Sequence, residues 1–228
     1  MKNILARGGI EFIAVFLGIA LSLWVDEYQQ SKEAKKLNNQ ILKRLHDNLE
    51  ADSTDVIWNY KAHLFSKQGC EKVLEWCDNG QKKQDSLDIF ISSIAITTFF
   101  VNNVEEYNAL KSSGRMELLD NEDLVKKLHD YYTLVNFVKT IDERIADNSY
   151  NRFIPFMRDY ADFHGYKESR IVYDIYGVFS LTATPPIPKL KMFASNKKDV
   201  SERTSKRYSQ LAEDVTKIRK MIRKELKS

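Results

Sequence analysis

Histidine and cysteine, the residue types that most often carry chemistry in proteins, are few and scattered in this chain of 228 residues. The histidines lie in four separate segments, and none has a second ligand at the spacing of a zinc or iron site. They are His46, His63, His129 and His164. Cys70 and Cys77 would lie about 10.5 Å apart along one straight helix, which is beyond disulfide reach. We therefore expect two buried free thiols, no metal site and no cofactor.

Arg158 and His164 have a spacing that could support catalysis. In the segment RDYADFH they fit the loose Arg-x(4 to 6)-His spacing of HEPN-type ribonucleases, helical enzymes that use both side chains around the scissile phosphate. Any Arg and His this close in sequence match, and the alternative is that both simply end a helix. The chain has no phosphate-binding glycine loop and no Gly-x-Ser-x-Gly elbow. We keep a ribonuclease as an alternative and favour a protein that is not an enzyme.

A carboxylate, Glu11, lies inside an otherwise apolar segment, residues 8–25. At about 1.5 Å per residue this segment forms roughly 27 Å of helix, enough for a thin bilayer. A cleaved signal peptide is the alternative, because basic residues precede the apolar run. Trp24 and Tyr28 suit a membrane interface, and the charged sequence after them continues in helical phase. These features favour an uncleaved signal anchor that crosses the membrane once.

Glu11, Ala14, Gly18 and Ser22 share one face of that helix, because they are spaced by three or four residues. Small residues let helix backbones approach closely in a membrane, and a carboxyl on the same face could bond to its copies or face water. This pattern predicts self-association through the span, with a pore as one form of it. The alternative is that Glu11 only reaches the headgroup region.

Charge is unevenly distributed along the chain, whose formal net charge is +3. Two Lys or Arg precede the apolar segment and five follow it by residue 44. The positive-inside rule then favours an inner-membrane protein with a cytoplasmic C-terminal body. Residues 189–228 hold 13 Lys or Arg against 5 Asp or Glu. Aromatic residues do not alternate with these charges as a base-stacking surface requires, so we expect contact with lipid rather than with nucleic acid.

Apolar periodicity predicts an all-α fold, in which the transmembrane helix continues into a long amphipathic helix and a helical bundle follows. We divide the chain into a tail and span at 1–25, a helical body at 26–165, a Pro-containing loop at 166–198 and a basic helix at 199–228. Helical spacing marks the core positions of the first and last helices. They are Leu42, Leu45, Leu49 and Val56, and then Tyr208, Leu211, Val215, Ile218, Ile222 and Leu226.

Capping residues predict the shorter helices of the body. Ser86 should cap a buried helix over residues 87–100, and Asn103 a short helix that Gly114 ends. A long helix should then run from about Glu122 to Arg152. The segment after residue 165 contains three prolines and is expected to form a loop with a short extended piece.

Two stretches resemble a family of uncharacterised single-pass membrane proteins of Bacteroidota. GIEFIAVFLGIALSLWVDEYQQSKEAKKLNNQILKRLHDNLEAD resembles the family's N-terminus, with its Gly-x-Glu before an apolar run and a Trp. EYNALKSSGRMELLDNEDLVKKLHDYY resembles its Leu-Lys-Ser-Ser-Gly signature. The resemblance covers residues 8 to about 160. It implies the architecture and a role for the acid at position 11, but no activity.

These observations lead to one main hypothesis, a homo-oligomeric membrane protein that forms a pore or a membrane-perturbing or signalling assembly. A role in antiviral defence rests on analogy with helical membrane proteins that accompany RNA-targeting CRISPR systems. The alternatives are a membrane-tethered HEPN-like ribonuclease and a membrane scaffold for a partner protein. The expected partners are membrane lipid and further copies of the chain.

Overall fold

The computed structural model describes residues 2–81, 86–168 and 175–227, and all of their side chains except those of 2–12, 14, 164–168 and 175–178. The fold is mainly helical, as the sequence predicts, with one β-hairpin. In chain order the elements are α1 (Lys2–Asp78), α2 (Leu87–Ile94), α3 (Glu105–Ser112), the 3₁₀ turn η1 (Arg115–Leu118), α4 (Glu122–Asn148), the π-helical turn η2 (Ser149–Phe153), α5 (Ile154–Met157), β1 (Ala161–Glu168), β2 (Ile175–Leu181) and α6 (Ile187–Glu225).

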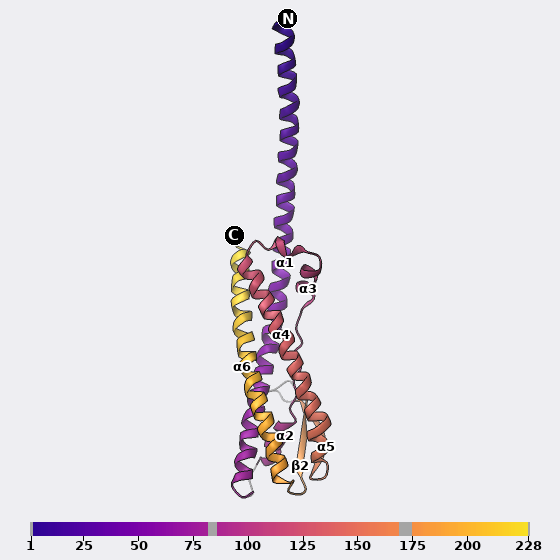
Figure 1. Cartoon of the computed structure of the whole chain (residues 1–228), viewed down its shortest axis with the longest axis vertical. Helices are drawn as coiled ribbons and strands as arrows, with labels where there is room; N and C mark the ends of the chain where they lie inside the picture. The colour runs from indigo at the N-terminus through magenta and orange to yellow at the C-terminus, as the bar shows by residue number, and fades with distance from the viewer. Residues whose placement is uncertain (1, 82–85, 169–174, 228) are drawn as a thin grey trace.

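A bundle of three long helices forms the body (Figure 1). The second half of α1 and all of α4 run in one direction, and α6 returns between the same two ends of the body. The first half of α1 extends beyond the body as a single helix, with the N-terminus at its far end (Figure 1). The core is therefore built by residues after about position 37.

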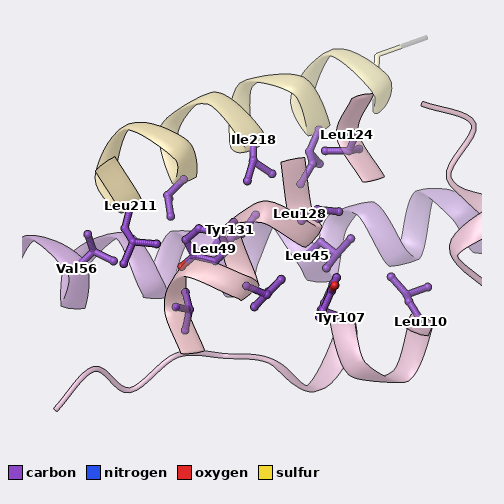
Figure 2. Close-up of a cluster of buried hydrophobic side chains, with 14 of the residues drawn as sticks. Leu45, Leu49, Val56, Tyr107, Leu110, Leu124, Leu128, Tyr131, Leu211 and Ile218 are labelled. Carbon is purple, nitrogen blue, oxygen red and sulfur yellow. The ribbon is translucent and has the colours of Figure 1, made fainter. Parts of the chain in front are cut away.

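The larger hydrophobic cluster fills the half of the bundle nearest to this extension (Figure 2). The four apolar positions predicted in α1 are all buried, and so are five of the six predicted in the last helix. Leu226 is the exception, with 37% of its surface exposed. Most of the remaining core residues come from α3 and α4, among them Tyr107, Leu124, Leu128 and Tyr131. The 3.6-residue period thus predicts the packing faces of the long helices.

A second cluster closes the other end of the body, where α2, α5 and the hairpin cover the bundle. β1 and β2 are antiparallel, with Phe163 opposite Phe179 and an irregularity in the register between Phe163 and Tyr166. The hydroxyl of Ser92 in α2 accepts a hydrogen bond from the Phe179 amide at 3.0 Å. Cys70 and Cys77 are free and buried beside this cluster, as predicted.

Helices α1 and α2 approach each other closely at Gly69. A Cβ atom at this position would lie 2.1 Å from the Ser93 hydroxyl and 2.5 Å from the Ser93 Cβ. Only glycine therefore fits there without displacing α2.

The prediction for residues 87–100 is wrong in two respects. Ser86 has φ 70° and its side chain makes no cap hydrogen bond, and the helix ends at Ile94. The chain from 96 to 103 instead forms neither helix nor strand and runs as an extended segment between α2 and α3, where polar side chains of the bundle accept some of its backbone hydrogens. Asp55 accepts the Val101 amide at 2.8 Å, and Asp52 accepts the Asn103 amide at 2.8 Å. Asn103 is consequently not the cap of α3, which is Val104.

The predicted loop over 166–198 is also different in the structure. It contains β2 and the start of α6, which begins at Ile187. Pro188 fits in the first turn of this helix, where the missing amide hydrogen would have no intrahelical acceptor.

Gly114 has φ +71° directly after α3, as a helix-ending glycine should.

Candidate functional site

The part of α1 that extends from the body exposes a long run of apolar side chains. We call residues 13–36 the stem, and every residue in it with a described side chain is exposed. Its large apolar residues have 42–64% of their surface exposed. They are Ile13, Val15, Phe16, Leu17, Ile19, Leu21, Leu23, Trp24, Val25 and Tyr28. They occupy all sides of the helix, so burial against one face of the body could not cover them.

Three of the four residues of the predicted association face, Ala14, Gly18 and Ser22, belong to the first half of the stem, and Glu11 precedes it in the sequence. Glu11 and Ala14 fall outside the described side chains. Gly18 and Ser22 are both exposed, and a Cβ atom on Gly18 would meet no other atom within 4 Å. The face is therefore open at these two positions in a single chain.

Among the residues with described side chains, no helical stretch combines the length and the apolar character that a membrane crossing requires. Residues 8–12 and 14 of the predicted span are outside this set.

The predicted ribonuclease pair is divided between two elements. Arg158 is exposed directly after α5. His164 lies on β1 rather than at the end of a helix, and its side chain is outside the described set.

Asp142 of α4 is 1% exposed and joins three parts of the bundle. His63 Nε2 of α1 lies 3.1 Å from one carboxylate oxygen of Asp142, and the Tyr208 hydroxyl of α6 donates to the other. The same His63 nitrogen is 3.3 Å from the Thr98 hydroxyl of the extended segment. Burial lowers the pKa of His63, so the ring stays neutral at neutral pH.

A second buried carboxylate, Asp52 of α1, has an equivalent role nearer the stem. It accepts a hydrogen bond from the Tyr131 hydroxyl at 2.9 Å, and from the amide and side chain of Asn103 at 2.8 and 2.9 Å. Burial nevertheless raises the pKa of Asp52 above its ordinary value. Asp52 holds the extended segment against α1 and α4 directly, and Asp142 does so through His63. Both carboxylates therefore have a structural role.

Lys197 of α6 is 4% exposed, and its ammonium donates to the Ile96 carbonyl. Burial lowers the pKa of Lys197 to about 8. Burial also raises the pKa of the nearby Cys70 thiol to about 11, so this cysteine is not an activated nucleophile.

In the described part of the chain, one group of side chains has the proximity that a metal site needs. Ligand atoms of His46, Asp47 and Glu50 lie within 4.8 Å of one another. Two of them already bind α6, because Arg223 donates to His46 at 3.0 Å and Arg219 pairs with Glu50. This arrangement explains the group as a contact between α1 and α6.

The buried polar residues were missed because carboxylates and lysines on amphipathic helices usually face solvent. The signal was nevertheless present in their spacing. Asp52 lies three or four residues from Leu49 and Val56, and Asp142 lies likewise from Val138 and Ile145. A charged residue at an apolar position of a helix predicts a buried network.

Comparison with protein-family models, with curated proteins and with solved structures finds no significant match. The Bacteroidota resemblance therefore stays a prediction.

Proposed function

We propose that this chain is a single-pass membrane protein that self-associates through its N-terminal helix. The observation that carries the proposal is the stem, whose large apolar side chains are exposed and which extends beyond the body as a single helix (Figure 1). Each large side chain of this kind gains about 1.5–3 kcal/mol on leaving water, so a stem of ten such residues needs a cover. A bilayer covers all sides of one helix at once.

The distribution of residues along the stem also supports a membrane-crossing helix. Trp24 and Tyr28 stack with ring centroids 6.0 Å apart at the end of the apolar run, where aromatic residues anchor helices at a membrane interface. The polar residues 26–36 then add about 16 Å of helix before the body begins. The body would thus be held off the membrane surface, on the cytoplasmic side if the lysines that follow the span set the topology.

Self-association is the second part of the proposal, and it places Gly18 and Ser22, with Glu11 and Ala14, at the contact between helices. Gly18 has no neighbour within its own chain that explains a glycine in a helix, where glycine costs about 1 kcal/mol relative to alanine. A close helix contact in the membrane is a physical reason for it. Dye leakage from liposomes measures whether the assembly opens a pore.

Membrane retention tests the first part. Full-length protein should remain in the membrane fraction after alkaline carbonate washing, and Leu17→Lys combined with Leu21→Lys should release it, because each lysine costs about 2.5–3.5 kcal/mol in a span. Val101→Lys is the matched control, since Val101 is 74% exposed on the body. Equal retention of the stem and body variants would refute the membrane role of the stem.

Gly18→Leu tests the second part. Gly18 is exposed and an added Cβ atom meets nothing within 4 Å, so the change should leave the fold intact while blocking helix approach. The oligomeric mass in neutral detergent should fall to that of a monomer, and an unchanged oligomer would refute this contact face.

A further inference from the structure

We propose that the groove between α4 and α6 binds a water-soluble anion with an apolar part, such as an alkyl phosphate or a fatty carboxylate of short chain. The groove has a volume of about 400 Å³, within the range of small-molecule sites. It is lined by the second half of α4, from Phe137 to Asn148, and by α6 from Asn196 to Arg207. The proposal is independent of the function proposed for the stem.

The charge of the groove selects an anion. Arg144, Arg203 and Arg207 all line it, and no Asp or Glu is among the lining residues. Within the described residues none of these arginines takes part in an ion pair. Some exposed cations of the bundle do have acidic partners, as Lys206 has in Glu202 and Arg44 in Glu106. Three unpaired guanidinium groups around one groove suit a phosphate or carboxylate, which they can bind in a bidentate manner.

The walls of the groove require that the anion also has an apolar part. Ile141, Ile145 and Val200 line it beside Phe137, whose surface is 50% exposed. Arg207 lies over the Phe137 ring, with its guanidinium carbon 5.1 Å from the ring centroid. An inorganic phosphate would leave these apolar walls in contact with water. A ligand with an alkyl or aryl group would cover them and place its anionic end at the arginines.

The position of the groove favours a ligand from solution over a lipid headgroup. α4 begins and α6 ends at the stem end of the body, and the groove uses the opposite half of each helix (Figure 1). A bilayer at the stem would therefore be separated from the groove by much of the bundle. Charge and apolar character then define one occupant, a free amphiphilic anion.

Titration calorimetry on the full chain in neutral nanodiscs tests this assignment, with hexyl phosphate as the probe. We expect saturable binding of hexyl phosphate, weaker binding of inorganic phosphate and no binding of hexanol. Arg203→Gln should weaken binding of hexyl phosphate about tenfold, as expected for loss of a charged hydrogen bond. Phe137→Ala should weaken hexyl phosphate more than inorganic phosphate.

Arg158→Gln is the matched control, because Arg158 is an exposed arginine outside the groove. Equal weakening by Arg158→Gln and Arg203→Gln would overturn the site, and so would the absence of any saturable binding. A different result would be that hexyl phosphate does not bind and that only nanodiscs with anionic lipid bind to the protein in a way that depends on Arg203. The ligand would then be a lipid headgroup, and the assignment to a soluble anion would be wrong. None of these outcomes depends on Gly18 or on the oligomeric state.

Discussion

The buried lysine of α6 gives a sharp prediction for stability against pH. Replacement of Lys197 by methionine removes an ammonium that is 4% exposed and that donates to the Ile96 carbonyl. The pKa of Lys197 falls from 10.5 in an unfolded chain to about 8 in the folded one. Between these two pH values the folded chain binds fewer protons than the unfolded chain, so stability rises with pH. One pKa unit corresponds to 1.36 kcal/mol, and the gain over the whole window is about 3 kcal/mol.

The assay is urea unfolding of the full chain in neutral detergent, measured at about pH 8 and at about pH 10.5. Other groups also titrate in this window, and apart from Cys70, whose thiol interacts with the Lys197 charge, they do so alike in the wild type and the variant. The wild type should therefore gain about 3 kcal/mol relative to Lys197→Met as the pH rises. Lys198→Met is the control at the neighbouring, partly exposed position, and it should follow the wild type. Parallel pH curves for wild type and Lys197→Met would refute the burial argument.

Three further predictions concern the packing and polar network of the body. Gly69→Ala should destabilise the fold by about 1–3 kcal/mol, because its methyl group would collide with a serine of α2, whereas Gly18→Ala should not destabilise it, because an added Cβ meets nothing there and alanine is the better helix former. Tyr131→Phe should cost about 1.5–3 kcal/mol, since Asp52 loses a hydrogen bond in the core; an unchanged unfolding midpoint would show that water replaces the hydroxyl. The pKa of His63 is lowered in the folded state, so its stabilising contribution is present above pH 6.5 and is lost as the pH falls. His63→Phe should therefore lose less stability in acid than the wild type.

The long helices could be predicted from the sequence because their apolar faces repeat at helical spacing. Leu45 and Leu49 of α1 and Leu211 and Ile218 of α6 are all buried, as their spacing predicts. Helix ends were predicted less well where tertiary contacts decide them. Asn103 has the side chain of a helix cap, yet Asp52 binds it and holds the chain extended before α3.

The hairpin and the early start of α6 illustrate the limits of local signals. Prolines at 185, 186 and 188 mark a break in the chain, but they also suit the first turn of a helix. Only the packing of Leu190 and Phe193 into the second cluster decides between these readings. The groove between α4 and α6 likewise combines residues about 60 positions apart in sequence, which no local spacing could have brought together.

The proposed association face was deduced from spacing alone, and the fold leaves its described members open to contact. Gly18 and Ser22 lie on the stem and both are exposed, so neither contributes to the core of a single chain. The proposal that they form contacts between molecules therefore rests on the sequence pattern.

Oxidative crosslinking of Gly18→Cys in carbonate-washed membranes tests the central claim most directly. The two native cysteines are buried, so the wild-type chain serves as the background. Val101→Cys provides an exposed thiol on the body as the control. If the stem crosses the membrane and self-associates, Gly18→Cys should be in the membrane fraction and form a disulfide-linked dimer, while Val101→Cys stays monomeric. Monomeric Gly18→Cys, or its release by the carbonate wash, would contradict the account.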